Sequence, residues 1–217
     1  MNSIPAALKI LSVPVAAMAL ISCQPKPDVT NAPKPKPVLY EWNDTGGPGQ
    51  LVVKISLSEQ MARFERNGTV VGWSYVATGV SGHPTPMGEY KVLEKKIEKV
   101  SSLYGRILNA EGGVVDSDAN STDVLAEGQQ FVASPMPYWM RLSWSGLGMH
   151  IGAIPKPGNP ASHGCIRMPR KFVPTLYEVV KIGTLVTIAQ DYTPPEIPEK
   201  PSRWLASKSK TSASNTQ

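Results

Sequence analysis

A cysteine and two histidines stand close together between residues 150 and 168. Cys165 is one of only two cysteines in the chain, and His150 and His163 precede it by 15 and 2 residues. A free thiol is mostly protonated at neutral pH, and a nearby imidazole that takes its proton yields a thiolate nucleophile. We therefore expect an acyl-transfer enzyme with Cys165 as nucleophile and His150 as general base.

The residues around this group favour a compact catalytic loop. Three prolines and a glycine within residues 155–160 constrain the segment after His150, which can fold back and bring that histidine to Cys165. Gly164 leaves space beside the sulfur, so the backbone amides of residues 163–165 are candidates to stabilise an oxyanion. The sequence leaves open which of these amides does so.

Other roles for the same residues compete with catalysis. Two cysteines in an exported protein often form a disulfide. Here Cys23 ends the leader and Cys165 lies in a compact polar motif, so a disulfide between them is the weaker interpretation. A zinc site from His150, His163 and Cys165 lacks the usual closely spaced ligand pair, and we expect neither a metal nor a cofactor. A thiol redox role lacks a second cysteine in the domain.

Apolar residues between Leu39 and Ala189 recur mostly with the two-residue period of β-strands. The predicted strands are 51–57, 61–66, 70–78, 89–94, 141–144 and 184–189. Asn67-Gly68 supplies the turn of a hairpin, and Pro169–Val180 is the best helix candidate. The pattern predicts a mainly β domain, a β-sandwich or partly open barrel with one or two short helices.

The chain begins with the features of an exported lipoprotein. In residues 1–22, Lys9 precedes an apolar run that is too short to span a bilayer, which predicts a signal peptide. Leu20-Ile21-Ser22-Cys23 resembles the lipobox of bacterial lipoproteins, which implies cleavage before Cys23 and lipidation of Cys23. We therefore expect a lipid-anchored protein in the cell envelope that faces the periplasm or the cell wall.

The predicted catalytic domain covers residues 39–190 and lies between two segments of biased composition. Residues 23–38 alternate proline with lysine, which favours an extended linker of roughly 3 Å per residue. Residues 191–217 are rich in proline, serine and lysine, and we expect a disordered tail. The formal net charge is +5, with no basic stripe interleaved with aromatic residues, so we expect no nucleic-acid partner.

The block Ser162-His163-Gly164-Cys165-Ile166-Arg167-Met168, with His150 upstream, resembles the signature of the L,D-transpeptidase catalytic domain. Weaker likeness extends from about Leu51 to Ala189. The resemblance implies an L,D-transpeptidase-like β fold. It also implies an enzyme that cross-links peptidoglycan tetrapeptide stems by cysteine acyl transfer, with release of a terminal D-amino acid.

The resemblance also suggests roles for neighbouring residues. His163 would shape the oxyanion pocket or the substrate contacts, and Ser162 would fix His163 by a hydrogen bond. Arg167 would hold the motif loop or face a substrate carboxylate. Tyr138 belongs to an aromatic cluster typical of core packing, and its hydroxyl is an alternative oxyanion donor.

Two rival functions remain open at this stage. An L,D-carboxypeptidase or endopeptidase of the same fold would use water as its second nucleophile, and a non-catalytic lipoprotein would only bind the wall. Presence of both a nucleophile and a base argues against the second alternative. We expect a monomer, and the segment 98–131 fits no recognisable pattern.

Overall fold

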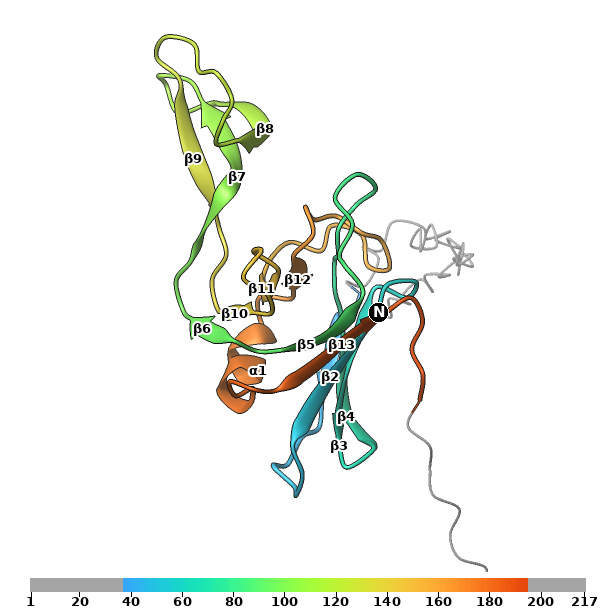
Figure 1. Cartoon of the computed structure of the whole chain (residues 1–217). Coiled ribbons are helices and arrows are strands. Elements are labelled where there is room, and N and C mark those ends of the chain that lie inside the picture. Colours follow the sequence, from blue (N-terminus) through green and yellow to red (C-terminus); the bar gives the residue numbers. More distant parts are fainter. Residues whose placement is uncertain (1–36, 195–217) are drawn as a thin grey trace, which may run out of the picture. The chain divides into compact units, whose positions relative to one another are not determined.

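The computed structural model describes residues 37–194, a mostly β structure with one short α-helix (Figure 1). Its elements, in chain order, are β1 (Tyr40–Trp42), β2 (Leu51–Ser56), β3 (Met61–Arg66), β4 (Thr69–Tyr75), β5 (Gly88–Lys91), β6 (Glu94–Lys96), β7 (Val100–Leu108), β8 (Val114–Asn120), β9 (Gln130–Pro135), β10 (Trp139–Arg141), β11 (Gly148–Ile151), β12 (Ile166–Met168), α1 (Val173–Val179) and β13 (Leu185–Ala189). The strands form three separate sheets and no closed barrel. The predicted mainly β fold is confirmed.

The largest sheet has six strands in the order β1-β4-β3-β2-β13-β5. Neighbouring strands in this sheet are antiparallel, except β13 and β2, which run parallel to each other. Leu51, Val53 and Ile55 of β2 are buried, because alternate side chains of a strand share one face. Asn67 and Gly68 have φ angles of 47° and 74° in the turn between β3 and β4, as the predicted hairpin requires.

A smaller sheet, in the order β12-β11-β10-β6, carries the catalytic motif. β11 and β12 are parallel, with Met149 opposite Ile166 and His150 opposite Arg167. All four residues of β11 are buried, as is usual for a strand covered on both faces. The chain makes the crossing between these two strands through the loop formed by residues 152–165.

One hydrophobic core joins both sheets to α1. The ring of Phe172, directly before α1, lies 5.0 Å from Tyr40, 5.5 Å from Trp42 and 5.2 Å from Phe64, measured between centroids. Met149 and the other buried residues of β11 and β12 belong to the same cluster. Because close-packed side chains leave little room for adjustment, this core fixes the two strands that bear the motif.

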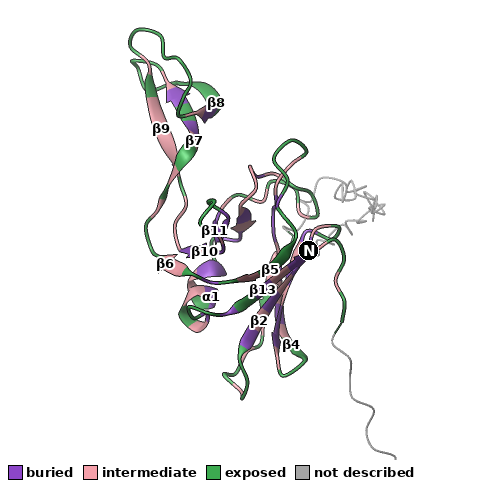
Figure 2. Cartoon of the chain, in the orientation of Figure 1, coloured by how far each residue is buried: buried purple, intermediate pink, exposed green. Residues whose placement is uncertain are grey.

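The third sheet, in the order β8-β7-β9, forms an arm between β6 and β10 that is defined here as residues 100–135 (Figure 1). Most of its residues are exposed or half-buried (Figure 2). Near its base, Val100 pairs with Pro135, and the next pair is Gly105 with Ala133. The four residues 101–104 therefore oppose Ser134 alone, which makes a large bulge in β7.

Three predicted elements differ from the structure. The strand expected at 89–94 is divided into β5 and β6, because the chain leaves the large sheet and Leu93 donates its amide to the carbonyl of Arg141 in the small one. The strand expected at 141–144 lies earlier, at β10, since residues 143–146 form a turn. The helix expected at Pro169–Val180 begins only at Val173, after a turn.

The predicted signal peptide 1–22, the lipidation site Cys23, most of the linker 23–38 and the tail from residue 195 lie outside the described residues. Within residues 37–194, no helix has both the length and the apolar character needed to cross a membrane.

Candidate active site

A cavity of about 620 Å³ opens where the small sheet meets the base of the arm. Cys165, His150 and Arg167 line it from β11, β12 and the loop before β12. The turn between β10 and β11 and the bulge of the arm supply further walls. The structure thus brings the predicted nucleophile and base to one concave site, as is typical of an enzyme.

Parallel pairing places Cys165 and His150 on the same wall. Arg167 lies opposite His150 in the strand pairing. Cys165 precedes Arg167 by two residues, so it lies opposite Gly148. Side chains two residues apart on neighbouring strands point to the same face of a sheet. His150, Arg167 and Cys165 therefore all face the cavity.

His150 is neutral and offers a lone pair at neutral pH. Its Nδ1 lies 2.8 Å from the carbonyl oxygen of Ile151, and because a carbonyl only accepts, Nδ1 carries the proton and Nε2 is bare. Burial lowers the pKa of His150 to about 4, the hydrogen bond to Ile151 opposes that shift, and the charge of Arg167 adds to it. This is the state that a general base needs.

Cys165 is a protonated thiol in the resting site. Its Sγ lies 3.4 Å from the carbonyl oxygen of Gly146, to which the thiol donates. Burial raises the pKa of Cys165, whereas the backbone amide of Gly148 and the charges of Arg167 and Lys99 lower it. A neutral thiol and a neutral imidazole therefore share the cavity, and proton transfer must accompany attack by the sulfur.

Ser162 organises the turn that holds Cys165. Its Oγ donates to the carbonyl oxygen of Cys165 at 2.5 Å and accepts the amide of Gly164 at 3.1 Å. The prediction that Ser162 fixes His163 by a hydrogen bond is therefore wrong, because the hydroxyl is used within its own turn. The amide of Gly164 is also occupied, whereas those of His163 and Cys165 make no hydrogen bond to another residue of the described chain.

Sequence analysis did not identify Thr85, which supports the same turn from a distant loop. Its Oγ1 donates to the carbonyl oxygen of Gly164 at 2.6 Å and accepts the amide of Gly79 at 2.8 Å. Gly164 has a φ of 108°, a conformation that glycine adopts more readily than other residues. No sequence signal indicated this contact, because Thr85 and Gly164 are 79 residues apart.

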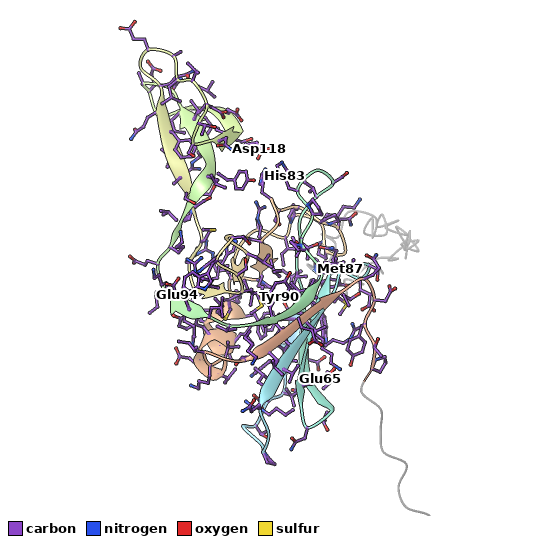
Figure 3. All side chains as sticks on the ribbon, viewed as in Figure 1. Glu65, His83, Met87, Tyr90, Glu94 and Asp118 are labelled. Atoms are coloured by element: carbon purple, nitrogen blue, oxygen red, sulfur yellow. The ribbon has the colours of Figure 1, made fainter. Side chains whose placement is uncertain are left out.

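His163 lies at the junction between the motif loop and the arm. Its Nε2 is 2.8 Å from Asp118 Oδ1 of β8, and its ring stacks on Tyr104 of β7 with centroids 4.3 Å apart. His83, on a loop of the main domain, lies 4.9 Å from it by the same measure. Figure 3 shows Asp118 and His83 where the arm approaches that loop. The His163 side chain thus contacts Asp118 and Tyr104 of the arm, and the Ser162 hydroxyl is not its hydrogen-bond partner.

Arg167 presents a positive charge to the cavity. Its guanidinium has no carboxylate within 4.0 Å among residues 37–194, although it is half-buried. A Cβ on Gly152 would lie 2.5 Å from the Arg167 side chain, so glycine at that position leaves space for its stem. The cavity therefore holds a cation that is free to meet an anionic substrate.

Tyr138 does not reach the site. Its ring packs edge-on against Tyr177 of α1, with centroids 5.3 Å apart, and it borders the hydrophobic core. The next residue, Trp139, lines the cavity instead, because neighbouring residues face opposite sides of a strand. The suggestion that the Tyr138 hydroxyl serves an oxyanion is therefore not supported.

No cluster of three or more His, Cys, Asp or Glu side chains suited to a metal ion occurs within residues 37–194. The chemistry that the described cavity offers is that of a thiol, an imidazole, a guanidinium and free backbone amides.

Residues 50–188 match the sequence profile of the L,D-transpeptidase catalytic domain (YkuD). No curated protein matches the chain.

Among solved structures, an L,D-transpeptidase from Mycobacterium smegmatis is 17% identical with a TM-score of 0.50, over 65% of this chain and 59% of that one. L,D-transpeptidase 1 from Mycobacterium tuberculosis is 19% identical with a TM-score of 0.46, over 64% and 61%. The catalytic domain of the Enterococcus faecium L,D-transpeptidase is 25% identical with a TM-score of 0.46, over 65% and 98%. This chain thus spans about three-fifths of the mycobacterial chains.

The pKa of His150 makes the stability of the fold depend on pH. Below pH 6.5 an unfolded chain protonates this histidine, whereas the folded protein resists protonation until about pH 4. The free energy of unfolding should therefore fall by about 2 kcal/mol between pH 7 and pH 5 through this group alone. Urea denaturation of the wild type and of His150→Gln measures the effect. The loss should be present in the wild type and missing from the variant, and parallel pH curves would contradict the burial argument.

Proposed function

Because the chain belongs to the L,D-transpeptidase catalytic domain family, we propose that it cross-links peptidoglycan peptide stems through an acyl-enzyme on Cys165. The donor is a tetrapeptide stem that ends in a D-residue. The acceptor is the side-chain amine of a diamino acid in a second stem.

The parallel register of β11 and β12 carries this proposal. It sets a thiol and an imidazole with a bare Nε2 on one wall of a cavity that also contains an unpaired guanidinium. A nucleophile with an adjacent base is the minimum equipment for covalent acyl transfer. The same arrangement gives little advantage to a protein that only binds the wall.

In the first half-reaction, Nε2 of His150 takes the thiol proton as Sγ attacks the carbonyl between the diamino acid and the terminal D-residue. The free amide of Cys165 is the nearest candidate donor to the oxyanion, and that of His163 is the second. The C–N bond then breaks, and His150 returns the proton to the leaving amine. The products are a thioester on Cys165 and a free D-amino acid.

In the second half-reaction, the acceptor amine attacks the thioester carbonyl and transfers a proton to His150. The C–S bond breaks, the new amide leaves the site, and the sulfur recovers its proton. Arg167 is the residue best placed to bind the carboxylate of the terminal D-residue in the donor, because its guanidinium faces the cavity and has no carboxylate partner among residues 37–194.

The envelope location follows from the proposed substrate together with the N-terminal sequence. A lipid on Cys23 and the proline-rich segment after it would tether the catalytic domain to a membrane beside the wall, since two or more acyl chains give stable anchoring.

Substitution at the two reacting residues tests the proposed function. Cys165→Ala should abolish release of the D-amino acid from tetrapeptide-stem fragments, and His150→Gln should slow it by about 100-fold or more, the scale of lost base catalysis. His83→Gln changes an exposed histidine that does not line the cavity, so it is the matched control and should retain most of the acylation rate. Mass spectrometry of the products separates cross-linked dimers from tripeptides. Tripeptides alone would mean that water is the acceptor, and strong activity in Cys165→Ala would refute the nucleophile.

A carbapenem provides a second test, because a thiolate opens its strained amide and forms a thioester. One drug mass should be added per chain, on the peptide that contains Cys165. The reactive form is the neutral pair, so the inactivation rate should be constant at neutral pH and fall only as His150 is protonated near its pKa of about 4. An acid limb centred at pH 6.5 would contradict the lowered pKa of His150.

The anchor is tested separately by Cys23→Ser. We expect this variant to leave the membrane fraction while it keeps its activity on soluble stem fragments, because the lipid and the active site are different parts of the chain. Fractionation followed by immunoblotting measures the distribution. A Cys23→Ser protein that stays with the membrane would indicate an uncleaved leader instead of a lipid anchor.

A further inference from the structure

The turn between β10 and β11 carries a large aromatic side chain at the rim of the cavity. Trp144 is 74% exposed, although it lines the same cavity as Cys165. A tryptophan normally buries most of its surface, and aromatic side chains that line a cavity commonly pack against the ligand that fills it.

The turn itself does not need a tryptophan. The hydroxyl of Ser143 accepts the amide of Leu147 at 3.2 Å and lies 2.7 Å from the hydroxyl of Ser145. Gly146 has a φ of 101° and donates its amide to the carbonyl of Ser143 at 3.4 Å. These bonds fix the backbone, so a small polar residue at position 144 would serve the fold equally well.

The Trp144 ring is held in place from one side. The guanidinium carbon of Arg141 lies 4.9 Å from the ring centroid, and Nε of Arg141 donates to Glu94 Oε1 at 3.0 Å. This cation–π contact costs the ring little of its accessible surface. The result is a fixed aromatic surface flanked by polar groups.

Trp144 lies close enough to the thiol to contact the far end of a peptide stem. The carbonyl oxygen of Gly146, two residues after Trp144, lies 3.4 Å from Cys165 Sγ. Two residues of chain add at most about 7 Å, so Trp144 lies within reach of a group about 10 Å from the sulfur. In a donor stem, three residues separate the reacting carbonyl from the sugar, and they span about 10 Å when extended.

We propose that Trp144 is a stacking platform for the sugar ring that carries the donor stem, an inference that rests on the proposed function. The stem offers small and charged groups, whereas the glycan strand offers pyranose faces lined with C–H groups. The negative face of an indole attracts such polarised C–H groups, as it attracts the positive edge of another aromatic ring. The enzyme therefore prefers glycan-linked stems over free peptides.

The test compares two donors, a disaccharide-tetrapeptide and the free tetrapeptide. Trp144→Ala should lower kcat/KM for the disaccharide-linked donor by about 3- to 10-fold, mainly through KM, and leave the free tetrapeptide unchanged. Trp144→Phe should restore most of the preference. Trp73→Ala removes a half-buried tryptophan of β4 that does not line the cavity, and it should change neither donor. Equal losses with both donors, or none, would overturn the inference.

A binding measurement decides the question without turnover. The N-acetylglucosamine–N-acetylmuramic acid disaccharide is titrated into ¹⁵N-labelled protein, and the indole N–H signal of Trp144, assigned by its loss in Trp144→Phe, is followed. A saturable shift of this signal is expected, and its absence would refute the platform. If the disaccharide binds but no stem is turned over, the proposed transpeptidase reaction fails while the inference stands.

Discussion

The parallel pairing of β11 with β12 is the constraint on which the site depends. Parallel neighbours cannot be joined by a tight turn and need a crossing of a dozen or more residues. Here the crossing is made by residues 152–165, so His150 on β11 and Cys165, directly before β12, are separated by 15 positions in the sequence yet lie side by side. The spacing that first suggested a nucleophile and a base is thus the length of the connection that a parallel pair requires.

Burial has opposite effects on the two reacting groups, and both effects favour their neutral forms. It lowers the pKa of His150 and raises that of Cys165. Both directions disfavour an ion pair of thiolate and imidazolium in the empty cavity. The positive charge of Arg167 favours that thiolate, while the Gly148 amide faces the sulfur from the opposing strand.

Local signals were sufficient to predict much of the fold. The strands at 51–57, 61–66 and 184–189 were predicted nearly to the residue, because alternation and a glycine turn are encoded within each segment. The candidate nucleophile and base were predicted from one short block of sequence, and the structure places both in one cavity. What the sequence could not indicate depends on distant contacts, such as Thr85 holding Gly164.

Side-chain direction was the second limit. Tyr138 has a φ of 57°, an unusual value for a residue with a Cβ, and this backbone turns its ring toward Tyr177 while Trp139 takes the cavity side. No apolar pattern signals such a conformation. Ser162 was misassigned for a related reason, since its hydroxyl bonds the amide of Gly164 and the carbonyl oxygen of Cys165, which only the folded turn reveals.

The arm shows how a segment without a clear sequence pattern can complete the cavity. The bulge in β7 moves residues 101–104 out of the regular ladder with β9, and these residues line the cavity. Ser101 stabilises that bulge by accepting the amides of Leu103 and Tyr104, and Tyr104 then stacks on His163. One wall of the cavity is thus built on the packed core, whereas the other is supplied by an exposed sheet joined to it through a few polar and aromatic contacts. The wall on the core holds Cys165 and His150, and the arm supplies residues 101–104 to the same cavity.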